Sequence, residues 1–530
     1  MAHDTVNRPL DCLIRTLKRP PRTPLPWPSR LGLTLLAWSL CLSPAWSQRN
    51  ALPSLGEGEG ISLAAERQLG DRIIRELYRD PDYIEDAVLD EYIQKLWTPL
   101  VDAAAARGEL SPELRERFAW RILLGRDRSV NAFALPGGYL GVHLGLIAVV
   151  SSRDELASVM AHELSHVTQR HIARSMEAQG RMTPWVIGSL ILGALAASKN
   201  PQATQALVVG GQAAAVQSQL SYSRDMEREA DRIGFGVLSD AGYDPRGFVG
   251  MFGKLQQAAG VNDNGAYPYL RSHPLTTERI ADMQSRLPLG VTFSNVPQDM
   301  EQAMVSARAR VLSQSQVDSL RAWTQLPVNL PAQATSAQKA GSLYAAALAH
   351  QMLREPEQAR KQWQALQAVT AANTVAARLT RLLGAELQAA RGEYAQVVQG
   401  LQPSSMVGRW PRPELVGVAL ALAHLPGHPA TASVVQQLRQ QVQTTPHDAQ
   451  AWNLLGSLLA GQGQKLSALR AEGEAQLVRM DLQGAQDRFR AAQDVARQGN
   501  LQAGDHIEAS IVDTRVREIQ EQLREMQKER

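Results

Sequence analysis

The chain has no cysteine beyond position 41. Its two cysteines, Cys12 and Cys41, both lie in an N-terminal leader over residues 1–47. With that leader removed, the mature chain contains neither a thiol nor a disulfide, which excludes a disulfide-bonded fold. An oxidising compartment permits disulfides without requiring them in large domains, so cysteine usage does not decide the compartment.

The chain also has few aromatic residues and little net charge. Aromatic residues make up 5% of the 530 residues, and the formal net charge is +3 at pH 7. So small a charge gives no case for nucleic acid as a partner. A hydrophobic content of 44% and a charged content of 20% are typical of a soluble globular protein. The length indicates two or more domains.

Long hydrophobic runs are missing as well, because no apolar stretch reaches the roughly 20 residues that a membrane-spanning helix needs. A short apolar stretch at residues 31–42 follows a basic segment and precedes the small residues Ala45 and Ser47. This order predicts a signal peptide over residues 1–47 that is cleaved before Gln48. An uncleaved anchor and a start codon further downstream are the alternatives.

Two further short apolar segments, rich in glycine and alanine, lie at residues 185–197 and about 206–216. Small residues suit either close helix packing or shallow contact with a membrane surface. We predict a packed helical hairpin here. Peripheral membrane contact through residues 185–216 is the alternative.

The periodicity of apolar residues predicts an α+β fold that is predominantly α-helical. Helical spacing occurs in four segments of the first part of the chain, at about residues 60–120, 154–176, 221–238 and 276–287. Residues 121–124 and 129–144 are extended in pattern, and Pro136 interrupts the second of these segments. The sequence therefore predicts a small sheet among many helices.

The helix predicted at residues 154–176 carries a metal-binding motif. Residues 161–166 read Ala-His-Glu-Leu-Ser-His, so His162 and His166 share one helix face and can reach one metal ion. Glu163 lies where it can take a proton from a water that Zn²⁺ acidifies, and can return it to the leaving amine. Burying these groups without a metal would be costly. The motif predicts one Zn²⁺ per chain, with Glu163 as the catalytic base.

A third ligand must come from another segment, since catalytic zinc has three protein ligands and one open position. The metzincin spacing requires a glycine and a histidine where this chain has Gln169 and Ile172. Residues 223–231 instead hold Glu227 and Asp231 four positions apart, on one helical face. We predict that Glu227 is the ligand and that Asp231 accepts a hydrogen bond from a ligand histidine.

Glu229 and His171 lie near these residues in the sequence but are not predicted to be ligands. Glu229 is the alternative ligand from the same acidic segment. His171 lies five positions after His166, which is off the ligand face of a continuous helix. We therefore predict a structural role for His171.

Composition changes at residues 326–336, where prolines and small residues predict a linker. The linker divides a predicted metallopeptidase domain, residues 48–325, from an all-α domain, residues 337–530. In the second domain, Trp452, Gly456 and Ala475 fall in phase with the tetratricopeptide pattern. This predicts a TPR-like helical repeat domain, with a plain helical bundle as the alternative.

These separated motifs, in this order, resemble one group of zinc peptidases, the gluzincins that include the CAAX prenyl proteases, HtpX and the mitochondrial protease Oma. The similarity runs from about residue 66 to residue 287. It is carried by His162-Glu163-x-x-His166, Glu227-x-x-Ala230-Asp231 and the strings at 131–134, 166–171 and 272–274. The leader and the helical repeats most resemble a periplasmic, repeat-carrying branch of this family.

The resemblance implies roles for residues outside the metal motif. It implies that His273 and Arg279 lie at the metal cleft, where either could stabilise the transition-state oxyanion. Alternatively, His273 occupies the fourth metal position of a resting enzyme. The resemblance also implies that an extended substrate pairs with a strand over residues 133–139, and an ordinary core strand is the alternative.

The resulting hypothesis is a zinc metalloendopeptidase in the periplasm of a Gram-negative bacterium, located at the periphery of the outer membrane. It would hydrolyse unfolded or misassembled envelope proteins and could act as a chaperone. The resemblance implies outer-membrane β-barrel proteins and their assembly machinery as partners. The alternative is a repeat scaffold or chaperone whose peptidase site is largely silent and self-inhibited. The short apolar segments disfavour a membrane-embedded processing protease.

Overall fold

The computed structural model describes residues 61–178, 223–260, 267–287, 299–402, 409–499 and 504–528. The leader and the segment 185–216 lie outside the described residues, so the predictions made for them stay predictions. All described residues belong to one compact unit, Glu59–Arg530. None of the described helices combines the length and the apolar character needed to cross a membrane.

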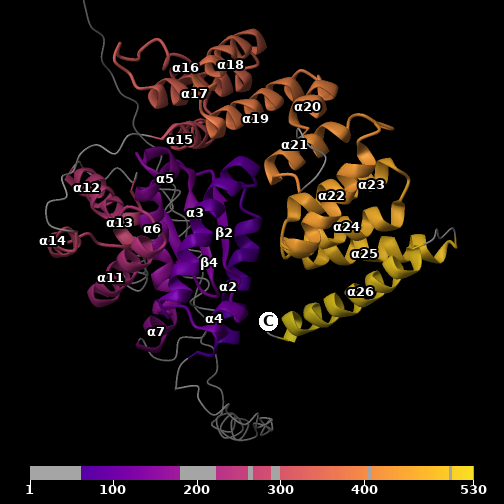
Figure 1. Cartoon of the computed structure of the whole chain (residues 1–530). Coiled ribbons are helices and arrows are strands. Elements are labelled where there is room, and N and C mark those ends of the chain that lie inside the picture. The colour runs from indigo at the N-terminus through magenta and orange to yellow at the C-terminus, as the bar shows by residue number, and fades with distance from the viewer. Residues whose placement is uncertain are drawn as a thin grey trace, which may run out of the picture. The chain divides into compact units, whose positions relative to one another are not determined.

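A four-stranded sheet lies in the N-terminal part of this unit (Figure 1). The strands follow the order β1-β2-β4-β3, with β2 and β4 parallel and the other two pairs antiparallel. Their bounds are Tyr83–Ile84 for β1, Arg121–Gly125 for β2, Ala132–Leu135 for β3 and Tyr139–His143 for β4. Among the described strands, β3 is therefore an edge strand beside β4.

The prediction of one strand through residues 133–139 is wrong in its extent. The chain reverses between β3 and β4 through Gly137 and Gly138, whose φ values of +76° and +83° favour glycine. Only residues 133–135 of the predicted segment lie on the edge strand, and Tyr139 begins β4 in the sheet interior. Pro136 thus marks a turn rather than an interruption within one strand.

Helices surround the sheet in the N-terminal part. The bounds are α2 Leu63–Tyr78, α3 Ala87–Ala106, α4 Pro112–Arg117, α5 Leu144–Val149, α6 Arg153–Thr168, α7 His171–Ala178, α11 Arg224–Asp240, α12 Arg246–Gly260, α13 Tyr269–Ser272 and α14 Thr277–Ser285. Helix α6 packs against α3, α11, α12 and strand β3. Every residue from Asp154 to Val167 is buried, so α6 is the central helix of this part.

The structure breaks the single helix predicted at residues 154–176 into two. Helix α6 ends at Thr168, α7 begins at His171, and Arg170 between them has a left-handed φ of 52°. Such a conformation is uncommon for arginine. The Arg170 side chain bonds Glu66 on α2, with Nε 2.9 Å from Oε2. This contact connects the junction of α6 and α7 to α2.

The described residues from 299 onward are mostly helical, and the predicted fold class is confirmed. The helices are α15 Met300–Ser313, α16 Val317–Thr324, α17 Ser336–Met352, α18 Pro356–Thr370, α19 Thr374–Ala390, α20 Tyr394–Leu401, α21 Arg412–Leu422, α22 Thr431–Thr444, α23 Ala449–Gly461, α24 Lys465–Val478, α25 Leu482–Arg497 and α26 Asp505–Lys528 (Figure 1). Successive helices pack on one another, as α17 does on α18 and α23 on α24. The tetratricopeptide assignment and the domain bounds stay predictions.

One hydrophobic cluster joins the sheet-containing part to the helices that follow it. Buried residues of this cluster extend from Leu63 to Ala475. Helix α3 also contacts α21. Four acidic residues at β1 and the start of α3 each meet an arginine from further along the chain: Glu85–Arg479 at 2.7 Å, Asp86–Arg308 at 2.7 Å, Asp90–Arg412 at 3.3 Å and Glu91–Arg378 at 2.6 Å. We call these four contacts the α3 ion-pair row.

Candidate metal centre

Helix α6 presents the three residues of the His-Glu-x-x-His motif. Ser152 caps its N-terminus by accepting a hydrogen bond from the backbone N–H of Glu155. One turn of helix separates His162 from His166, and their Nε2 atoms lie 3.0 Å apart. The exposed fractions of His162, Glu163 and His166 are 1%, 0% and 1%. The motif therefore lies in the interior rather than on a surface helix.

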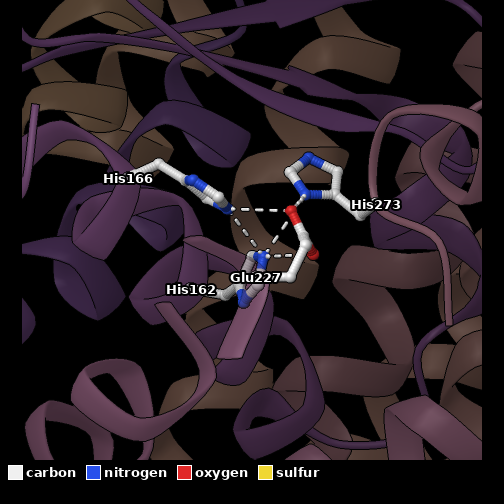
Figure 2. A group of neighbouring side chains, drawn as sticks. All are labelled: His162, His166, Glu227 and His273. Carbon is white, nitrogen blue, oxygen red and sulfur yellow. Dashed lines mark hydrogen bonds and ion pairs between the residues drawn. The ribbon is translucent and has the colours of Figure 1, made fainter. Parts of the chain in front are cut away.

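Helix α11 brings a carboxylate to this pair of histidines. Glu227 lies with Oε2 3.6 Å from Nε2 of His162 and with Oε1 3.4 Å from Nε2 of His166. His273, directly after α13, has Nδ1 3.0 Å from Oε1 of Glu227. Donor atoms of these four residues all lie within 4.8 Å of one another (Figure 2).

This group has the chemistry of a metal site. Asp231 lies 3.0 Å from Nδ1 of His162, so a neutral His162 holds its proton on Nδ1 and leaves the Nε2 lone pair free. Burial lowers the pKa of His166 well below 6.5 and keeps that ring neutral. Imidazole nitrogens and a carboxylate oxygen converging in a buried space fit a divalent cation.

Asp231 and Arg279 form a layer behind the ligands. The Arg279 guanidinium donates to both carboxylate oxygens of Asp231, at 2.6 and 2.8 Å, and lies 2.7 Å from Oε2 of Glu227. Burial raises the pKa of Asp231, but hydrogen bonds from Arg279 and His162 outweigh it, and the net shift is downward. Arg279 also donates to the carbonyl of Pro274 at 2.8 Å. These contacts favour a role for Arg279 in orienting Asp231 and Glu227, rather than in binding an oxyanion directly.

Glu163 lies next to the sheet. Its Oε2 accepts a hydrogen bond of 2.9 Å from the backbone N–H of Ala134 on β3. Its Oε1 lies 3.3 Å from Nε2 of His273. Burial raises the pKa of Glu163 above 4.5, and a higher pKa makes a carboxylate a better proton acceptor near neutral pH. A backbone N–H of edge strand β3 thus hydrogen-bonds Glu163, the residue that we predict to be the base.

The structure brings together all seven residues predicted for the site. His162, His166, Glu227 and His273 form the donor group, while Glu163, Asp231 and Arg279 each contact one of its members. Glu229, the alternative ligand, does not belong to the donor group found among the described residues. Its carboxylate instead contacts His171 and Arg174. Sequence reasoning missed the contact of His171 with His166, because it assumed a continuous helix.

Comparison with known proteins gives an independent result. The model of peptidase family M48 matches residues 91–287. The beta-barrel assembly-enhancing protease of Escherichia coli (strain K12) is 30% identical over 458 residues, which cover 83% of this chain and 87% of that protein. The corresponding protease of Yersinia pestis is 30% identical over 435 residues, covering 81% and 84%.

Two further relatives match over shorter lengths. A provisionally named beta-barrel assembly-enhancing protease of Vibrio cholerae is 38% identical over 264 residues, which are 49% of this chain and 52% of the relative. The mitochondrial metalloendopeptidase OMA1 of Arabidopsis thaliana is 33% identical over 196 residues, which are 37% of this chain and 36% of that protein. The family resemblance drawn from the motifs is confirmed.

Proposed function

The chain belongs to peptidase family M48 and is a metallopeptidase, and on that premise we propose that it is a zinc endopeptidase of the cell envelope. The proposed ligands are His162, His166 and Glu227, with one Zn²⁺ per chain. Two imidazoles and a carboxylate are a ligand set of catalytic zinc. When bound there, zinc supplies a Lewis acid that lowers the pKa of water to about 7.

Glu163 performs the proton transfers in this proposal. Its Oε2 is held by the Ala134 N–H, which leaves Oε1 to take a proton as water attacks the peptide carbonyl. The same oxygen then gives the proton to the leaving amine. Strand β3 carries Ala134 on the edge of the sheet, where an extended substrate segment can add by backbone pairing. Backbone pairing demands little of the substrate sequence.

We propose unfolded or misassembled outer-membrane proteins as the substrates. The names of the Escherichia coli and Yersinia pestis relatives connect those proteins with β-barrel assembly, and the predicted leader supports export to the periplasm. The helical segment after α15 would then dock substrates or the assembly machinery. One observation supports peptide hydrolysis at this site, namely the buried donor group beside Glu163.

Cleavage by the purified chain tests this function. We expect residues 48–530 to contain close to one zinc per chain and to cut a denatured outer-membrane β-barrel protein. The same protein folded in detergent micelles should resist cutting, because its strands are already paired. Zinc content is measured by metal analysis and cleavage by gel electrophoresis. Zinc without cleavage of either form, in both the wild type and His273→Ala, would favour the scaffold or chaperone alternative.

A resting, self-inhibited site is supported by the position of His273. Its Nδ1 lies 3.3 Å from Nε2 of His162 and within the donor group. A four-coordinate metal held by all four residues would have no position for water. His273 is 2% exposed, and its ring stacks on Tyr269 with centroids 4.5 Å apart. We propose that His273 must move away before the peptidase acts.

Replacing His273 by alanine is therefore expected to raise cleavage of an unfolded protein several-fold while zinc stays bound. The reason is that the substitution frees one position without removing His162, His166 or Glu227. Ser272→Ala is the control, since Ser272 is the adjacent residue and is not part of the donor group. The initial cleavage rate is measured together with zinc content. A lower rate in His273→Ala would instead assign His273 to transition-state stabilisation.

A further inference from the structure

The outer nitrogen of His166 faces another histidine. Nδ1 of His166 lies 2.7 Å from Nδ1 of His171, and Nε2 of His171 lies 3.0 Å from Oε2 of Glu229. Both rings are buried, with exposed fractions of 1% for His166 and 0% for His171. The contact to Glu229 fixes where the protons lie in this chain of groups.

The proton positions follow from what each atom can do. A carboxylate only accepts, so Nε2 of His171 carries the proton that Glu229 accepts. Nδ1 of the neutral His171 ring is then an acceptor, and it takes the proton of His166 Nδ1. His166 is left with the lone pair on Nε2, which is the atom that faces Glu227 and His162. The contacts thus select the one neutral tautomer of His166 that can bind a metal through Nε2.

The break between α6 and α7 makes these contacts possible. On a continuous helix, residues five apart point in different directions. Here the left-handed Arg170 turns α7 so that the first residue, His171, reaches back to His166. At the other end, Arg174 of α7 donates to Oε2 of Glu229 at 2.7 Å. The acceptor is therefore held from two sides.

We propose that His171 and Glu229 are positioning residues for the metal ligand His166, an inference that rests on the zinc site of the proposed function. Helix α11 would then support the site through three carboxylates. Glu227 binds the metal, Asp231 orients His162 directly, and Glu229 orients His166 through His171. An imidazole placed between ligand and carboxylate serves as the outer hydrogen-bond partner that metal-bound histidines commonly have.

Zinc affinity of the full chain tests the proposal without relying on activity. Competition against a chromogenic chelator should show zinc binding that is about 10- to 100-fold weaker in His171→Phe than in the wild type, because phenyl keeps the ring but removes both hydrogen bonds. His171→Asn should recover much of the affinity, since its amide oxygen can accept the His166 proton. Glu229→Gln should give a smaller loss in the same direction. Asp225→Asn, at an exposed acidic position of α11, should bind zinc as the wild type does.

The melting temperature of the zinc-free proteins separates positioning from packing. A packing role for His171 would lower that temperature and leave zinc affinity unchanged, which would overturn the proposal. Equal zinc affinity in the wild type, His171→Phe and Glu229→Gln would also overturn it. Glu229 is partly exposed, so Glu229→Gln carries the test if His171→Phe does not fold. A wild type that takes up no zinc would refute the proposed zinc site itself, and the same chelator titration measures this.

Discussion

Replacing Glu163 by glutamine should reduce proteolysis by about 1,000-fold and leave zinc binding and the fold intact. Glutamine keeps the shape of glutamate and can still meet the Ala134 N–H through its amide oxygen, but it has no carboxylate to take a proton. General acid–base catalysis contributes about 10²–10⁴ to enzymatic rates. Cleavage of an unfolded substrate and zinc content are measured on the same preparation.

A second glutamate on α6 provides the control. Glu155 is also buried, and its carboxylate accepts from the backbone N–H of Ser151 and pairs with Lys254, away from the donor group. We expect Glu155→Gln to cleave substrate at close to the wild-type rate. Because the resting site is proposed to be inhibited, the comparison is repeated in a His273→Ala background, where the rate is higher. Full activity of Glu163→Gln in that background would remove Glu163 from the mechanism.

Replacing Glu227 by alanine should remove most of the zinc and, with it, the proteolysis. The change deletes a predicted ligand and leaves Arg279, which lies 2.7 Å from Glu227, without one of its two acidic partners. We expect zinc affinity to fall by more than the roughly 10- to 100-fold typical of losing an outer hydrogen-bond partner. His162→Ala and His166→Ala should behave in the same way.

The order of effects along α11 is the sharper test of this assignment. Glu227→Ala should cost the most zinc affinity, and Asp231→Ala and Glu229→Ala should cost less, since neither of those residues is in the donor group. Metal content after dialysis against a weak chelator gives the ranking. If Glu229→Ala lost more zinc than Glu227→Ala, the metal ligand on α11 would be wrongly assigned.

The pairs of residues that share a helix face could be predicted from the sequence because that information is local. His162, His166, Glu227 and Asp231 are pairs four apart on helices, and the geometry of a helix then fixes which residues share a face. The small sheet and the helical C-terminal part followed from periodicity for the same reason. The choice of Glu227 as the partner of the two histidines rested on zinc chemistry, and the placement of His273 and Arg279 rested on the family resemblance.

The residues that were missed depend on backbone geometry that the sequence does not signal. Arg170 adopts a left-handed φ although it is not glycine, and its contact with Glu66 comes from α2, about a hundred positions earlier. Without that break, His171 could not reach His166. The proposed role of Glu229, which acts through His171, therefore could not be predicted from the sequence. The turn at Gly137 and Gly138 is different, because Pro-Gly-Gly is a recognisable turn signal that was interpreted as an interruption within one strand.

The α3 ion-pair row constrains how the two parts of the chain can evolve. Helix α3 contacts both α6, which carries His162 and His166, and α21 of the later helices. A recombination that exchanged the helices after the predicted linker with those of a relative would leave Glu85, Asp90 and Glu91 facing foreign side chains near α6. The two halves are therefore expected to diverge as a matched pair, with acidic and basic positions changing together rather than as freely exchangeable modules.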